Sequence, residues 1–110
     1  MAYQHKKQAG GEWSKSSFFS QMANIGSEVG RAINWRRKEN KAYARGAFER
    51  SLELFDLTAA DPRNIGRLKE ILRAREAWVD FFAYDNEYNS TAGQWEKYFL
   101  AFNYAANLNR

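Results

Sequence analysis

The chain has 110 residues, 45% of them hydrophobic, and its formal net charge is +4. This length fits one domain with its own core, and the lack of cysteine excludes disulfides, zinc–thiolate sites and cysteine nucleophiles. No apolar run approaches the roughly 18 residues that a membrane span requires, and residues 1–16 lack the apolar stretch of a signal peptide, so we expect a soluble cytoplasmic protein without membrane contact.

Residues 1–16 are polar, include Gly10-Gly11 and hold the one histidine, His5. Such a segment has little apolar surface to bury, so we expect a disordered or loosely docked arm. The remaining residues, 17–110, carry the apolar periodicity of helices. We therefore predict a single helical domain preceded by a flexible N-terminal arm.

The first helix is predicted to begin after Ser16 or Ser17, either of which can cap it, and to end at about Arg37. Its apolar side chains recur at spacings of three and four and form one stripe, made of Phe18, Met22, Ile25, Val29 and Ile33. Gly26 and Gly30 lie inside this helix, where each costs about 1 kcal/mol relative to alanine. We expect a packing reason for them, because small residues let another backbone approach closely.

A second helix is predicted from Lys41 to about Ala60, with Asn40 as its N-cap. One face collects most of its apolar and small residues, which are Ala44, Phe48, Ser51, Leu52, Phe55 and Ala59. Neither glycine nor proline separates it from the first helix, so one continuous helix from Ser17 to Ala60, about 65 Å long, is the competing prediction. We favour the turn, because such a rod would leave its apolar stripe uncovered.

Asp61-Pro62, which contains the only proline of the chain, predicts the start of a third helix. Aspartate is a favoured N-cap, and proline suits the first helical position because its missing N–H is not needed there. We predict an α-helix from Pro62 to about Tyr84. Its inward stripe is expected to contain Ile65, Leu68, Leu72, Val79 and Phe82, widened by Ile71, Trp78 and Phe81.

Residues 85–90 are polar and predict a loop, after which Ser90 or Thr91 can cap a fourth helix from about Ala92 to Asn107. The inner face of this helix is expected to hold Trp95, Phe99, Phe102 and Ala106. Four helices with short connections favour an antiparallel, up-down bundle. The predicted fold is therefore all-α, a small four-helix bundle.

The charges are unevenly distributed. Residues 31–50 contain seven basic and two acidic side chains, a net of +5, whereas residues 76–96 contain five acidic side chains and no lysine or arginine. An up-down bundle places the turn between helices one and two at the same end as the loop between helices three and four. We therefore expect the basic and acidic clusters to be neighbours and to favour this arrangement, although individual exposed pairs contribute little.

A functional alternative is that the basic cluster binds nucleic acid, either RNA or a single strand. Its cations would contact phosphates, and an aromatic ring would stack on an unpaired base. The residues concerned are Arg31, Trp35, Arg36, Arg37, Lys38, Lys41 and Arg45.

Catalytic chemistry finds little support in the sequence. His5 lies in the predicted arm, and neither a G-x-S-x-G motif nor a glycine-rich phosphate loop occurs, so we predict no catalytic residue and no cofactor. A metal-dependent hydrolase, with a divalent cation held by carboxylates between helices, is the least favoured function. Its weak candidate ligands are Glu28, Glu49, Glu53, Glu76 and Asp80.

The chain is rich in aromatic residues. Eight Phe, six Tyr and four Trp are more than a small bundle readily hides, and Tyr and Trp are enriched at protein interfaces. We therefore expect a non-enzymatic protein that acts through protein–protein contact, with a second copy in a homo-oligomer such as a dimer, or with another protein, as its partner.

Overall fold

The computed structural model describes residues 16–108, so nearly all of the predicted arm lies outside the described residues. In this range the chain forms four α-helices and one 3-10 helix, with no strand. In chain order the elements are α2 (Phe18–Arg37), α3 (Lys41–Ala60), the 3-10 helix η2 (Pro62–Arg67), α4 (Leu68–Ala83) and α5 (Ala92–Leu108).

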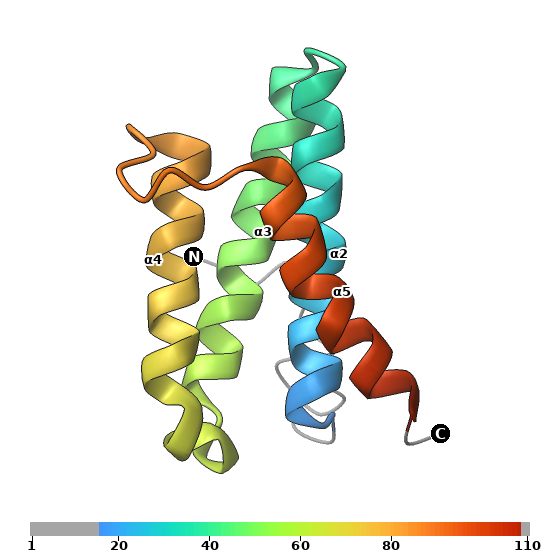
Figure 1. Cartoon of the computed structure of the whole chain (residues 1–110), viewed down its shortest axis with the longest axis vertical. Helices are drawn as coiled ribbons and strands as arrows, with labels where there is room; N and C mark the ends of the chain where they lie inside the picture. The colour runs from blue at the N-terminus through green and yellow to red at the C-terminus, as the bar shows by residue number, and fades with distance from the viewer. Residues whose placement is uncertain (1–15, 109–110) are drawn as a thin grey trace.

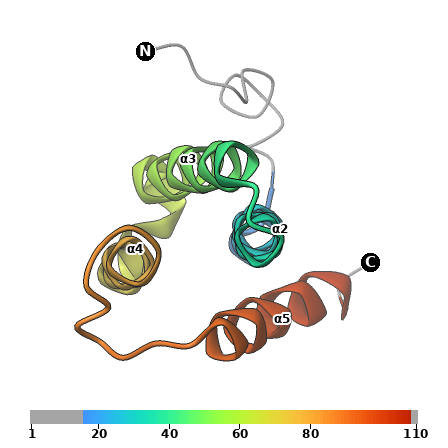
Figure 2. The ribbon, with the colours of Figure 1, turned by 90° about the horizontal axis from the view of Figure 1, so that it is seen from above.

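The helices alternate in direction, as Figure 1 shows. Helices α2 and α3 lie side by side as an antiparallel hairpin, α4 runs antiparallel to α3 on its other side, and α5 crosses α2 diagonally. Seen from above in Figure 2, α4 lies beside α3 and α5 lies beside α2, and a long connection joins α4 to α5. The predicted all-α, up-down four-helix bundle is confirmed, and no helix of the described part is long and apolar enough to cross a bilayer.

A tight turn separates α2 from α3, so the prediction of one continuous helix is wrong. The side chain of Asn40 accepts a 3.0 Å hydrogen bond from the backbone N–H of Tyr43, which is the N-cap contact that the sequence predicts. Glu39 adopts a left-handed conformation with φ of 60°, which reverses the chain direction. The hairpin can therefore form from local signals alone.

The start of the third helix differs from the prediction, because residues 62–67 form a 3-10 helix and the α-helix begins only at Leu68. Asp61 caps this turn by accepting from the backbone N–H of Arg63 at 3.0 Å. The buried Asn64 amide then donates to the side chain of Gln21 at 2.7 Å and to the carbonyl of Thr58 at 3.0 Å. These contacts tie the turn to the ends of α2 and α3.

The core lies between α2, α3 and α4, with α5 closing one side. Its fully buried large side chains include Met22, Ile25, Phe55, Ile71 and Trp78. The stripe predicted for helix three is partly wrong, because Ile65 and Leu72 face solvent while the expected flank, Ile71 and Trp78, is buried. A 3-10 turn advances three residues per turn rather than 3.6, so η2 does not continue the face of α4.

The two glycines of α2 have different surroundings. A Cβ added at Gly26 would lie 2.6 Å from Cβ of Phe99, so this position needs glycine for α5 to approach α2 closely. A Cβ at Gly30 would meet nothing within 4 Å. The predicted packing reason is therefore confirmed for Gly26 but not for Gly30.

Candidate interaction surfaces

Acidic side chains of the described chain form ion pairs with three of the arginines predicted to bind nucleic acid. Arg31 binds Glu28 at 2.6 Å, and Arg45 binds Glu49 at 3.1 Å, both within one helix. Arg37 on α2 reaches Glu96 on α5 at 2.9 Å. All three arginine side chains are more than half exposed, so these pairs add little to stability but do reduce the free positive charge of the cluster.

Arg36 packs against the C-terminal end of α4. Its guanidinium lies 4.9 Å and 4.6 Å from the ring centroids of Phe81 and Phe82, and it donates to the carbonyl of Phe82 at 3.1 Å. Cation–π contact and a backbone hydrogen bond therefore hold the C-terminal end of α4 against the tip of the hairpin. This placement indicates a structural role for Arg36.

The remaining residues predicted to bind nucleic acid are Trp35, Lys38 and Lys41, which lie at the tip of the hairpin formed by α2 and α3. Trp35 and Tyr43 meet edge to face with centroids 4.8 Å apart, and the Lys38 ammonium lies 5.2 Å from the Trp35 ring. Within residues 16–108, neither Lys38 nor Lys41 forms an ion pair. A groove of about 660 Å³ lies beside them, lined by Arg36, Glu39, Lys41, Ala44, Arg45 and Phe82.

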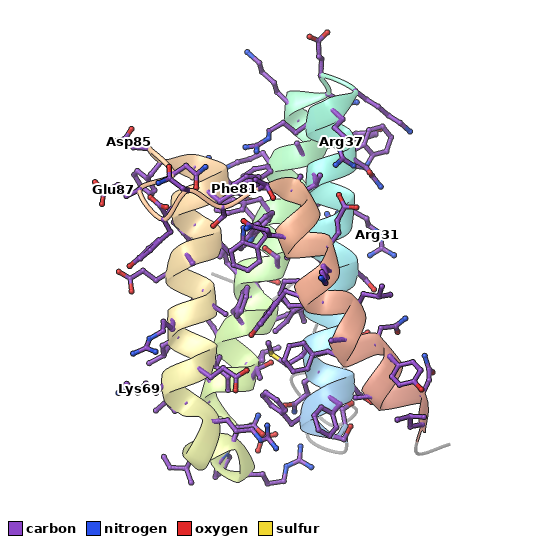
Figure 3. The ribbon with its side chains drawn as sticks, in the orientation of Figure 1. Arg31, Arg37, Lys69, Phe81, Asp85 and Glu87 are labelled. Carbon is purple, nitrogen blue, oxygen red and sulfur yellow. The ribbon has the colours of Figure 1, made fainter. Side chains whose placement is uncertain are left out.

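The acidic cluster only partly neighbours the basic one. Of its five members, Glu96 alone pairs with a member of the basic cluster in the described chain. Asp80, near the end of α4, instead binds the loop that follows this helix, where its two carboxylate oxygens accept from the backbone N–H groups of Glu87 at 2.9 Å and Tyr88 at 3.1 Å. Figure 3 shows Asp85 and Glu87 on this loop beyond the end of α4, apart from Arg31 and Arg37.

Three of the five carboxylates proposed as weak metal ligands have other roles. Both carboxylate oxygens of Glu28 bind arginine, at 2.6 Å to Arg31 and at 2.9 Å to Arg50. Glu49 pairs with Arg45, and Asp80 holds the loop. Across residues 16–108, no group of three or more histidine, aspartate or glutamate side chains is placed to hold a metal ion.

A groove of about 660 Å³ separates α4 from α5. Its lining includes Arg67, Lys69, Arg73, Ala77, Trp95 and Tyr98. The phenol of Tyr98 lies 3.5 Å from Glu70 across the groove, and burial together with the Glu70 charge raises its pKa to about 12. The buried indole Nε1 of Trp95 has no hydrogen-bond partner among the described residues.

Two outer faces expose large apolar side chains. On the α4 side these are Ile65, Leu72 and Tyr84, and on α5 they are Leu100, Tyr104 and Leu108. The α5 set recurs every fourth residue, a signal that sequence analysis did not use. The exposure of Tyr84, Tyr88 and Tyr104 agrees with the expectation that this bundle cannot hide all its aromatic rings.

Comparison with known proteins adds no relative. No protein-family model matches the chain, and neither a curated protein nor a solved structure matches it.

Proposed function

We propose that this protein acts through protein–protein contact and that it self-associates as a homodimer. The observation that carries the proposal is the exposure of large apolar side chains on the side of the bundle formed by η2 and α4, where Ile65 of η2 is 76%, Leu72 of α4 48% and Tyr84, just after α4, 74% exposed. Exposed apolar side chains that gather on one side of a protein are typical of an interaction surface. The described residues offer no covering element for this face.

Charge supports the same proposal. Most cations of the 31–45 cluster are engaged by acids or aromatic rings of the same chain, which weakens the case for a phosphate-binding surface. Tyrosine is also the residue type that interfaces favour, and both Tyr84 and Tyr88 are exposed beside α4.

Sedimentation equilibrium of the full chain from low to high micromolar concentration tests this proposal. We expect a mass that rises with concentration from one copy toward two. A mass of one copy at every concentration would contradict it.

Nucleic-acid binding at the tip of the hairpin is a second candidate. It is favoured by the juxtaposition of an exposed aromatic ring, Tyr43, with Lys38 and Lys41, neither of which forms an ion pair in the described chain. Stacking on such a ring and contact of the ammonium groups with phosphates are what single strands require.

Fluorescence anisotropy with a labelled oligonucleotide at low and moderate salt tests this candidate. Binding should weaken steeply as salt increases, and Lys38→Glu with Lys41→Glu should abolish it. Lys97→Glu on α5 is the matched control, because it removes an exposed cation distant in sequence from the tip. No binding at low salt would eliminate the candidate.

A further inference from the structure

We propose that the outer face of α4 is the dimer interface and that two copies meet there antiparallel about a two-fold axis. In this arrangement Lys69 of each copy faces the partner's Glu76. The inference rests on the proposed self-association and adds the surface, the orientation and the contacts that determine it.

The first argument is the segregation of charge along this face. Exposed Lys69 and Arg73 lie in the N-terminal half of α4, at the edge of its groove with α5, and exposed Glu76 lies in its C-terminal half, where Asp80 is already bound by the following loop. Within residues 16–108, no ion pair involves Lys69, Arg73 or Glu76. Figure 3 shows Lys69 projecting from the side of α4 that faces away from the bundle, with Asp85 and Glu87 at the opposite end of this helix.

Charge segregation of this kind determines orientation. A parallel pair of α4 helices would place like charges opposite each other, which is unfavourable. An antiparallel pair places the basic half of one helix on the acidic half of the other, twice by symmetry. The chain is therefore complementary to a second copy of itself in one orientation only.

The second argument is the position of an exposed apolar side chain in the middle of this face. Leu72 is 48% exposed on α4. With the two-fold axis near Leu72, that residue packs on the partner's Leu72. The same axis brings Lys69 near the partner's Glu76, so the apolar and charged contacts agree on one register.

The size of this surface predicts the strength of the contact. A single pair of helices buries less than the roughly 1,600 Å² of a standard interface, so we expect a weak dimer, with a dissociation constant on the order of micromolar. Such a dimer is sensitive to single charge reversals.

Charge reversal in the full chain tests the inference by sedimentation velocity. Lys69→Glu and Glu76→Lys should each weaken the dimer by about tenfold or more, because each creates two like-charge contacts. An equimolar mixture of the two variants should form a heterodimer, since every contact is then again between opposite charges. The double variant K69E/E76K should also regain dimerisation.

Controls separate loss of the interface from loss of the fold. Leu72→Asp should abolish the dimer, whereas Leu100→Asp and Lys97→Glu on α5 should not, and circular dichroism should show native helix content in each variant. If the wild type dimerises and the α4 variants do so equally well, or if mixing restores nothing, the inference falls while the proposed function stands. If the wild type is a monomer throughout, the proposed function itself fails.

Discussion

The indole Nε1 of Trp78 donates a 2.9 Å hydrogen bond to the hydroxyl of Ser51, which links α4 to α3 inside the core. The same hydroxyl donates to the carbonyl of Phe48 at 2.5 Å. Both Trp78 and Ser51 are fully buried. Because a serine hydroxyl donates and accepts at once, this small side chain satisfies two buried polar groups in the middle of the bundle.

Ser51→Ala should therefore lower the free energy of unfolding by about 1–3 kcal/mol, since it leaves the Trp78 N–H buried without an acceptor. Urea denaturation followed by tryptophan fluorescence measures the change. Ser27→Ala is the control, because the Ser27 hydroxyl bonds only the carbonyl one turn before it, at an exposed position. Equal effects of the two substitutions would contradict the role given to Ser51.

The glycines of α2 should respond in opposite directions to alanine. Alanine favours a helix over glycine by about 1 kcal/mol, and Gly30→Ala should gain up to this amount because its Cβ meets nothing within 4 Å. At Gly26 the new Cβ would lie 2.6 Å from Cβ of Phe99, which is fixed to the backbone of α5. Gly26→Ala should therefore destabilise by about 1–3 kcal/mol through overpacking.

Thermal denaturation of both glycine variants provides the measurement. A stabilised Gly26→Ala would show that α5 moves away from α2 at little cost, and would contradict the close approach described above.

Asp61 should make stability depend on pH in acid. Hydrogen bonds from Arg63 and Gln21 hold the pKa of its carboxyl well below the usual range. A carboxyl with a depressed pKa stabilises the fold above its ordinary value of about 3.9, and this stabilisation disappears as the pH falls further. Asp61→Asn should lower stability at neutral pH because it removes the negative charge that pairs with Arg63, although asparagine can still cap the turn.

The stability difference between wild type and Asp61→Asn should shrink progressively as the pH is lowered below about 4. Urea titrations at several pH values measure it. A difference that stays constant down to the most acidic pH at which the protein folds would rule out the charge of Asp61 as its cause.

Tyr98 should ionise at a higher pH than an ordinary tyrosine. Burial and the nearby Glu70 carboxylate raise its pKa to about 12, so alkaline titration of phenolate absorbance should contain a late step that Tyr98→Phe removes. A raised tyrosine pKa means that stability falls as the pH rises past the ordinary value of about 10. Glu70→Gln should shift the late step to lower pH, and an unchanged titration would contradict this assignment.

The starts of α3, of α5 and of the turn at Asp61 were predictable because their signals are local. Asn40 caps α3 and Asp61 caps the following turn through their own side chains, as their residue types indicate. Thr91 accepts from the backbone N–H of Gln94 at 3.1 Å at the start of α5. Each contact spans only two or three residues, so no knowledge of the tertiary structure was needed.

The buried face of α4 was not predictable in the same way. Its sequence is apolar on two sides, with Ile71 and Trp78 on one and Leu72 and Val79 on the other. Packing against α3 selects the first pair, and the 3-10 conformation of η2 separates Ile65 from the predicted stripe. The sequence pattern could place the residues on a helix but could not choose between two faces of similar hydrophobicity.

One ion pair of the basic cluster, between Arg37 and Glu96, depends on the diagonal course of α5. Arg37 pairs with Glu96 because α5 begins beside the C-terminal half of α2, and this crossing depends on Gly26, whose role charge patterning does not reveal. The candidate dimer surface was hidden for a related reason, since Leu72 was expected to point inward.

The attachment of α5 to the bundle mainly through α2 has a consequence for the order in which the molecule opens. Only Trp95 and Phe99 of α5 are buried, whereas the hairpin of α2 and α3 supplies most of the core. Amide hydrogens of α5 should thus exchange with solvent before those of the hairpin, as one cooperative unit. Helix α5 can therefore detach from α2 and bind it again while the hairpin of α2 and α3 stays folded.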